Sequence, residues 1–219
     1  MFTGLIETIG NIENISPRGD IWKCDILAPA IAGKLSEGDS VSVSGACCTV
    51  TNHDYKSFSV ELMEETRRRT KFESLRNSSK VNLERALRLD SRIDGHLVSG
   101  HIDGMAVVSD IKNGISSKEL HFTATPEITS GIVQKGSVTV DGVSLTVIDR
   151  GEDFFSVGII PTTLSATTIG DLRIGDKVNI ETDMIGKYIL SFLKSRFSED
   201  KDIVKNSITW DKLIEYGWG

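Results

Sequence analysis

Two copies of one short motif carry side chains that could take part in chemistry. The pattern Gly-x-(Cys or Ser)-x-Thr-Val occurs at Gly45–Val50 and again at Gly142–Val147. Alternate residues of an extended strand share a face, so the thiol of Cys47 and the hydroxyl of Ser144 each lie beside a threonine hydroxyl. Such pairs suit hydrogen bonding to the edge of a heterocyclic ring. The plainer interpretation is that small polar residues fit the interior of a tight barrel, but recurrence in both halves favours binding.

The motif belongs to an internal repeat that spans most of the chain. Self-similarity held in one register over this length indicates a duplicated domain. Duplication offers two similar pockets on one polypeptide, which suits chemistry on two copies of one ligand. The aligned pairs of segments are Ser40–Val50 with Ser137–Val147, Phe58–Val60 with Phe155–Val157, Lys80–Glu84 with Lys177–Glu181 and, with an offset shorter by one residue, Thr3–Glu7 with Ser99–Asp103.

Short strands are expected to position these residues. Val41 and Val43 alternate with serines, and the second half repeats the alternation. Local strands that are separated by Gly, Asn, Asp and Ser turns, without intervening long helices, pair antiparallel and favour a closed barrel. We therefore expect an all-β protein with one barrel in residues 1–97 and another in residues 98–184.

The C-terminal segment, residues 185–219, breaks the strand pattern. Apolar residues recur there with helical spacing and predict an amphipathic helix that starts near Asp183. The spacing leaves open whether this stripe packs on its own barrel or pairs with the same helix of another subunit. The tail from Ser198 onward is charged and ends in a short apolar piece. The stripe consists of Ile185, Ile189, Phe192 and Leu193.

Composition argues against several classes of protein. A net charge of -6 and 6% aromatic residues oppose a nucleic-acid-binding groove. No stretch approaches the roughly 18 apolar residues of a membrane helix, and no signal-like segment opens the chain. The 3 cysteines, two of them adjacent, favour a reducing compartment, so we expect a cytoplasmic protein without nucleic-acid or membrane partners. Metal-site spacing and phosphate-binding loops are both lacking, so we expect no metal and no nucleotide hydrolysis.

Three further segments carry polar groups. Gly95–His101 holds two histidines five positions apart, which face opposite sides of an extended segment and cannot act as a pair; we interpret one as structural. We interpret Ile159–Thr163 and its counterpart Leu62–Thr66 as extended strand ends whose free backbone groups could bind a flat ring. The basic run Arg67–Lys71 is interpreted as a solvated face.

Together, these residues resemble the riboflavin synthase family of the alpha type. The resemblance runs from residue 1 to about residue 197. Each match is weak alone, but the set is highly specific. The matching segments are Met1–Gly4, Gly45–Val50, Gly95–His101 and Asp141–Val147.

The resemblance implies two tandem six-stranded antiparallel Greek-key barrels and a C-terminal helix through which three chains assemble. It implies conversion of two molecules of 6,7-dimethyl-8-ribityllumazine into riboflavin and 5-amino-6-ribitylaminouracil by transfer of a four-carbon unit, without cofactor or metal. One barrel would hold the donor and the other the acceptor, where the first barrel of one subunit faces the second barrel of its neighbour. Lumazine synthase is the partner protein that the resemblance suggests.

The resemblance also assigns residues by position. One lumazine must lose a C7-methyl proton, for which we expect His101 or a hydroxyl-held water, and the other must accept a nucleophile at C7, positioned or supplied by Cys47 or Ser144. The catalytic set is His101, Ser144, Thr146, Cys47, Phe2 and Asp183. The first pocket is assigned Gly4, Leu5, Ile6, Cys47, Cys48, Thr49, Glu61, Leu62, Met63, Glu64, Glu65 and Thr66. The second is assigned Gly100, His101, Ile102, Lys135, Ser144, Leu145, Thr146, Gly158, Ile159, Ile160, Pro161, Thr162 and Thr163.

Three positions depart from the family pattern and bear mainly on the first pocket: Ser44 replaces the usual Asn, Glu64 a Pro and Asp94 a Gly. A different class of protein, the noncatalytic lumazine protein, shares the duplicated fold and binds one lumazine or flavin without turning it over. In those carriers the second barrel has lost its binding function, whereas the second half here keeps its polar residues, which favours the enzyme. These residues are His101, Lys135, Ser144, Thr146 and Thr163.

Overall fold

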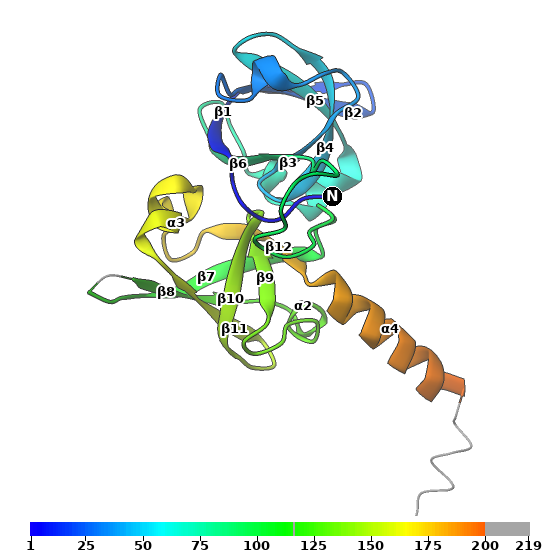
Figure 1. The fold of residues 1–219 in the computed structure, drawn as a ribbon, viewed down its shortest axis with the longest axis vertical. Helices are drawn as coiled ribbons and strands as arrows, with labels where there is room; N and C mark the ends of the chain where they lie inside the picture. Colours follow the sequence, from blue (N-terminus) through cyan, green and yellow to red (C-terminus); the bar gives the residue numbers. More distant parts are fainter. Residues whose placement is uncertain (116, 200–219) are drawn as a thin grey trace, which may run out of the picture. The chain divides into compact units, whose positions relative to one another are not determined.

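Twelve strands close into two antiparallel barrels in the computed structural model, which describes residues 1–115 and 117–199 (Figure 1). The first barrel has the order β1-β2-β5-β4-β3-β6, and the second has the same circular order with each strand replaced by its equivalent. This arrangement confirms the predicted pair of six-stranded Greek-key barrels. The strands are β1 (Thr8–Arg18), β2 (Ile21–Leu27), β3 (Ser40–Val43), β4 (Ala46–His53), β5 (Ser57–Met63), β6 (Lys80–Arg85), β7 (Gly104–Asn113), β8 (Lys118–Thr123), β9 (Ser137–Val140), β10 (Val143–Arg150), β11 (Phe154–Ile159) and β12 (Lys177–Thr182).

Short helices join the strands in equivalent places of the two barrels. Each barrel has a helical segment between its fifth and sixth strands, and in the first barrel this segment lines a cavity. A longer helix follows the second barrel. The helical elements are η1 (Ala32–Lys34), α1 (Glu64–Arg69), η2 (Lys71–Glu73), α2 (Pro126–Thr129), α3 (Pro161–Ala166), η3 (Thr168–Asp171) and α4 (Met184–Glu199).

Each barrel is built around its own apolar core. Along β4 the side chains of Ala46, Cys48 and Val50 are buried in the first core, while Cys47 and Thr49 face outward. The equivalent strand β10 has the same alternation. The period of two therefore places the polar face of the motif outside the barrel and the apolar residues inside it. The plainer interpretation, that the small polar residues fill the barrel interior, is wrong for Cys47 and Ser144.

Irregularities in the strands also recur in both barrels. The pairing register shifts between Ile12 and Asn14 in β1 and between Val108 and Asp110 in its equivalent, β7. A matching shift occurs in β4 and in β10. Bulges increase local twist and bend a strand, which helps six short strands close into a barrel.

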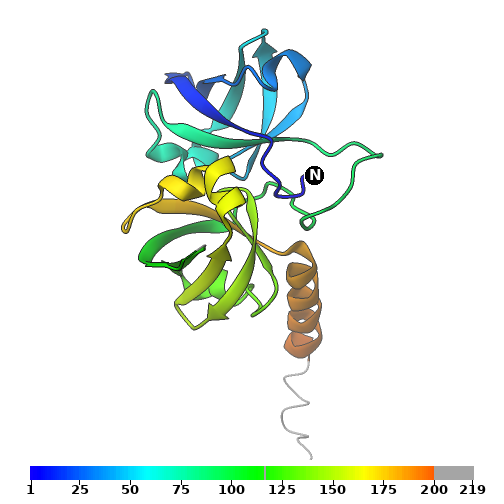
Figure 2. The ribbon, with the colours of Figure 1, turned by 60° about the vertical axis from the view of Figure 1, so that its left-hand side comes forward.

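Helix α4, the orange helix of Figure 2, begins at Met184, which confirms the predicted start near Asp183. Its stripe residues Ile189 and Phe192 are 54% and 59% exposed in the single chain. Tyr188, which is not part of the stripe, is 72% exposed. The predicted tail from Ser198 falls almost entirely outside the described residues. In the part of the chain that the structure describes, no helix is both long and apolar enough to cross a membrane.

The two barrels meet through two tight hairpin turns. Ser44 and Gly45 join β3 to β4 with φ values of 45° and 89°, and Asp141 and Gly142 join β9 to β10 with 48° and 79°. Positive φ at both central residues is the geometry of a two-residue turn that matches strand twist. A Cβ atom built on Gly142 would lie 2.6 Å from the backbone nitrogen of Gly45. The turns therefore pack backbone against backbone, which requires glycine at both positions.

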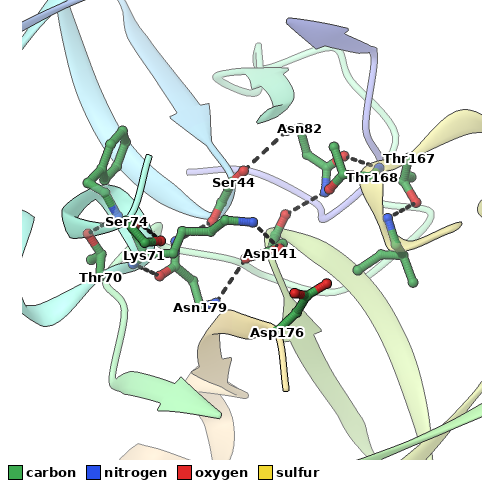
Figure 3. Close-up of polar contacts among 12 residues, drawn as sticks. Ser44, Thr70, Lys71, Ser74, Asn82, Asp141, Thr167, Thr168, Asp176 and Asn179 are labelled. Atoms are coloured by element: carbon green, nitrogen blue, oxygen red, sulfur yellow. Dashed lines mark hydrogen bonds and ion pairs between the residues drawn. The ribbon is translucent and has the colours of Figure 1, made fainter. Parts of the chain in front are cut away.

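Two buried asparagines link the barrels beside these turns (Figure 3). Asn82 of β6 donates its Nδ2 to the carbonyl oxygen of Asp141 at 2.9 Å, and Asn179 of β12 donates its Nδ2 to that of Ser44 at 2.8 Å. Each asparagine thus stabilises the hairpin turn of the other barrel. The pseudo-twofold relation between the halves extends to these hydrogen bonds.

Candidate functional site

The N-terminal segment of the chain lies on the second barrel. The carbonyl oxygen of Gly4 accepts a hydrogen bond from the Ser144 backbone N–H at 2.8 Å, and Ile6 packs against the second core. A Cβ on Gly4 would stand 2.6 Å from the Ser144 Cβ, so only glycine allows this approach. The grouping of Gly4 and Ile6 with the first pocket is therefore wrong, because these two residues contact the other barrel. Leu5 instead lines a cavity together with Glu84 and Arg85 of the first barrel.

The crossover between the barrels makes the reciprocal contact with the first barrel. The Gly100 carbonyl oxygen accepts a hydrogen bond from the Cys47 backbone N–H at 2.9 Å, and Ile102 packs against the first core. The grouping of Gly100, His101 and Ile102 with the second pocket is wrong for the same reason. A cavity of about 190 Å³ lies at this place and is lined by Ala46, Cys47, Glu65, Thr66, Arg69, Thr70, Gly100, His101 and Ile102.

Two buried carboxylates hold these crossing segments in place. Glu84 of β6 accepts hydrogen bonds from the N–H and hydroxyl of Thr3 at 2.6 and 2.7 Å and from the N–H of Gly4 at 3.0 Å. Glu181 of β12 accepts the matching set, from Ser99 at 2.8 and 2.6 Å and from Gly100 at 2.9 Å. Burial raises the pKa of Glu84 above its ordinary value, while the bonds from Thr3 and Gly4 act in the opposite direction. We name these two sets the carboxylate clamps.

The second barrel brings a histidine and a serine together. His96 Nδ1 lies 2.8 Å from Ser144 Oγ. Burial lowers the pKa of His96 below its ordinary value, and the charges of Asp183 and Glu181 oppose this shift. The imidazole is therefore neutral at pH 7 and can exchange a proton with the serine hydroxyl or with a bound ring.

The two histidines of the crossover serve different barrels. His96 lies at Ser144, and His101 lies exposed at the cavity beside Cys47. The prediction that they do not act as a pair is confirmed. The interpretation of one of them as structural stays a prediction. The contact of His96 with Ser144 has no signal in the sequence, because the two residues belong to distant segments.

The other predicted residues divide according to the face on which they lie. Thr49, Thr146, Glu61, Met63 and Gly158 face outward from the strands, whereas Cys48, Leu62, Leu145 and Ile159 are buried in the cores. The side chains of this second group cannot line a site on the outer face. Phe2 is fully buried and its backbone pairs with that of Val98, while Lys135 is exposed in a turn with φ 63°.

The strand ends after β5 and β11 are helical. Met63 is the last residue of β5, so Glu64–Thr66 form the first turn of α1; likewise Pro161–Thr163 form the first turn of α3. The expected extended backbone is therefore wrong at these positions. Proline at the first helical position is favoured because its missing N–H would have no partner there. In the first barrel, Glu65, Thr66 and Arg69 of α1 line the cavity.

The basic run is only partly a solvated face. The Arg67 guanidinium lies 4.4 Å from the centre of the Trp22 ring, and Arg68 and Arg69 pair with Glu64 and Glu65. Hydrogen bonds from Arg67, Arg68 and Trp22 lower the pKa of Glu64 to about 2. Lys71 is largely buried at the barrel junction. Arg67 and Lys71 are held by tertiary contacts with Trp22 and with the second barrel. A run of charged residues in the sequence does not predict such contacts.

We expect Cys47 to be the one rapidly alkylated thiol. Burial and the nearby Asp25 raise the pKa of Cys24 to about 12, and burial also raises that of Cys48. Thiolates, not thiols, react with iodoacetamide, so both buried cysteines should be inert at pH 8. Mass spectrometry of the folded protein should find a single modification at Cys47, which Cys47→Ser abolishes. Equal labelling of Cys24 would contradict this assignment.

Removal of Glu181 should open the first site but not the second. Glu181→Ala deletes the clamp on Ser99 and Gly100, so we expect faster alkylation of Cys47 and a loss of about 2–4 kcal/mol in the free energy of unfolding. Glu84→Ala is the matched control, since it deletes the equivalent clamp on Thr3 and Gly4. It should cost similar stability and leave the alkylation rate of Cys47 unchanged. Equal rates in the two variants would refute the crossed arrangement.

Known proteins agree with this architecture. The family model described as Lumazine binding domain matches residues 3–86 and again residues 99–183. The chain is 41% identical to riboflavin synthase of Bacillus subtilis (strain 168) and 38% identical to riboflavin synthase of Actinobacillus pleuropneumoniae, covering 100% of each chain. A crystal structure of LumP complexed with riboflavin aligns with a TM-score of 0.76 at 25% identity, over 83% of this chain and 99% of LumP.

Two matched lumazine-binding domains, full-length similarity to curated synthases and the duplicated barrels lead to one assignment: this chain belongs to the riboflavin synthase family.

Proposed function

We propose that this protein is a riboflavin synthase, which converts two molecules of 6,7-dimethyl-8-ribityllumazine into riboflavin and 5-amino-6-ribitylaminouracil. The observation that carries the proposal is that each barrel has a histidine beside its motif: Cys47 and Ser144 are equivalent residues, and a different histidine of the crossover serves each. The first has Cys47 with His101, and the second has Ser144 with His96. A reaction between two copies of one molecule needs two such sites, and holding both reactants in place removes much of the entropic barrier to their encounter.

The chemistry requires a proton acceptor and a group that assists addition at C7. We propose that neutral His96, held against Ser144, exchanges protons in the second site, and that His101 serves the first site beside Cys47. Thr49 and Thr146 continue the outward faces of β4 and β10 and would bind ring edges. Asp183 acts through its charge on His96, and Phe2 positions the N-terminal segment from its buried place.

Assembly into a homotrimer is part of the proposal. The first cavity, at about 190 Å³, is small for a ribityl-substituted two-ring ligand, and ligand pockets usually measure about 300 Å³ or more. A neighbouring subunit would complete it. The apolar residues Ile189, Phe192 and Leu193 give α4 a face that a second copy of the helix could cover.

Several finer points remain predictions. The free cysteines support a cytoplasmic location. Association with lumazine synthase and independence of a cofactor are proposed on the resemblance. Independence of a metal and domain boundaries after residues 97 and 184 are proposed on the sequence pattern.

A lumazine carrier is the second candidate. It is favoured by the likeness to LumP, whose solved structures include complexes with riboflavin and with 6,7-dimethyl-8-(1'-D-ribityl) lumazine. The latter is 23% identical to this chain with a TM-score of 0.75, which supports a shared fold. The contact between His96 and Ser144 in the second barrel favours the enzyme over the carrier.

One assay separates the two candidates. Purified protein is incubated with 6,7-dimethyl-8-ribityllumazine alone, and riboflavin is followed by absorbance. The synthase forms one riboflavin for each two substrates consumed. A spectral shift of bound lumazine without any riboflavin would instead establish the carrier.

A further inference from the structure

The pseudo-twofold junction between the barrels is asymmetric at one pair of positions. Lys71 and Thr168 occupy equivalent places: the Lys71 N–H donates to Asn179 Oδ1 at 2.8 Å, and the Thr168 N–H donates to Asn82 Oδ1 at 2.8 Å. The backbones are thus held alike. Their side chains, however, face different residues across the junction, since Asp141 in the second barrel is the equivalent of Ser44 in the first.

An ion pair fills one half of the junction (Figure 3). Lys71 Nζ lies 2.6 Å from Asp141 Oδ2, and the side chains are 11% and 0% exposed. The other carboxylate oxygen of Asp141 accepts the Asn179 N–H at 2.9 Å. A carboxylate withdrawn from water needs such compensation, so Lys71 cannot leave without leaving Asp141 as an uncompensated charge.

The equivalent residues of the other half, Ser44 and Thr168, cannot form an ion pair. The Ser44 hydroxyl accepts the Asn82 N–H at 3.2 Å, as the Asp141 carboxylate does for Asn179. The hydroxyl of Thr168 is buried and makes no hydrogen bond with any residue in the described ranges. The chain itself therefore demonstrates that Ser and Thr are tolerated where Asp and Lys stand in the equivalent half.

The ion pair lies next in sequence to the residues of α1 and of the link between α1 and η2 that line the first cavity. We call this segment, residues 64–73, the α1–η2 wall. Lys71 directly follows Thr70, and Thr70 lines the cavity together with Glu65, Thr66 and Arg69 of α1. The Thr70 hydroxyl donates to the Thr66 carbonyl oxygen at 2.7 Å, so α1 and η2 are tied to each other at this residue. Fixing Lys71 to the second barrel therefore fixes the end of this wall.

We propose that Lys71 is a positioning residue whose ion pair with Asp141 ties the α1–η2 wall of the first cavity to the second barrel. The equivalent segment of the second barrel, α3 and η3, lacks a buried ion pair at this position. It is joined to the first barrel by the pair of Lys80 with Asp171 of η3 at 2.7 Å, whose side chains are 56% and 64% exposed, and such exposed pairs contribute little. The ion pair of Lys71 with Asp141 therefore governs ligand affinity in the first cavity selectively. The inference rests on the proposed function only for the identity of the ligand.

The test compares the full-length protein with two variants. Lys71→Met removes the charge and keeps the chain length, while Lys71→Thr combined with Asp141→Ser copies the arrangement of the other half. Thr168→Val is the matched control, because it removes a hydroxyl that has no partner among the described residues. The measurements are the denaturation midpoint, the alkylation rate of Cys47 without ligand, the riboflavin concentration that halves this rate, and KM and kcat for lumazine.

The double variant shows whether Lys71 positions the α1–η2 wall or only stabilises the fold. We expect Lys71→Met to lower the denaturation midpoint and the double variant to restore it. In both, the ligand-free alkylation rate of Cys47 should rise about threefold, and the half-protecting riboflavin concentration about tenfold. The KM for lumazine should rise with little change in kcat, and Thr168→Val should match the parent protein.

A double variant that folds like the parent and also keeps the parent's Cys47 rate and protection would overturn the proposal. Absence of riboflavin protection in the parent protein would count against the proposed function. The ligand-free rates would still decide the role of Lys71 in that case, so the two failures are distinguishable.

Discussion

Gly142→Ala is expected to lower the free energy of unfolding by about 2–5 kcal/mol, enough to unfold much of the protein. Gly142 has a φ of 79°, where an L-side chain is strained, and its new methyl group would stand 2.6 Å from the Gly45 nitrogen and 2.9 Å from its Cα. The methyl group meets backbone of the other barrel rather than a flexible side chain. The clash can be relieved only by separating the two hairpin turns.

Gly38→Ala is the matched control for this experiment. Gly38 has a φ of 90°, but a Cβ there would meet nothing within 4 Å. It therefore carries the conformational strain without the clash and should cost only about 1–2 kcal/mol. Urea denaturation of both variants measures the difference. Equal destabilisation would mean that the close contact of the two turns contributes nothing to stability.

His96→Ala and Ser144→Ala are each expected to lower kcat/KM for lumazine by about a hundredfold. Their side chains lie 2.8 Å apart and would handle one proton as a unit. The double variant should therefore be little worse than either single variant. Residual activity is expected, because the acidity of the substrate and its positioning between two sites remain. His53→Ala, at an exposed histidine of β4, is the matched control and should retain full activity.

The pH profile gives a second view of the same pair. Burial lowers the pKa of His96 below 6.5, so the imidazole is neutral at pH 7 and gains its proton only at more acidic pH. A neutral base acts above its pKa, so kcat/KM should hold through neutrality and fall on the acid side. His96→Gln should lose this acid limb. If kcat/KM of that variant still falls at acidic pH as in the parent protein, the fall is due to the titration of another group.

The crossed segments link the two sites to the junction. The N-terminal segment is clamped by Glu84 of the first barrel and reaches Ser144 of the second. The crossover is clamped by Glu181 of the second barrel and reaches Cys47 of the first. Each site thus depends on both barrels. Pulling the barrels apart would dismantle both sites, which explains why the junction is built from buried hydrogen bonds and close-packed glycines.

The fold was predictable from the sequence because its determinants are local. Alternation of apolar and polar residues defines β4 and β10, and Ser-Gly and Asp-Gly pairs supply the positive φ of the two hairpin turns. The repeat carries these signals twice in one register, so each half supports the other. The outward face of Cys47 and Ser144 follows from the same period of two.

The contacts between distant segments could not be predicted from the sequence. Repeat alignment groups Gly4 with the first half and Gly100 with the second, yet each lies on the opposite barrel, because the contact depends on how two barrels pack and not on order along the chain. The pairing of His96 with Ser144 and of Lys71 with Asp141 arises in the same way. The sequence alone determined two barrels with equivalent motifs on their outer faces. Only the tertiary structure decided which segment completes each site, since packing across the pseudo-twofold junction brings those residues together.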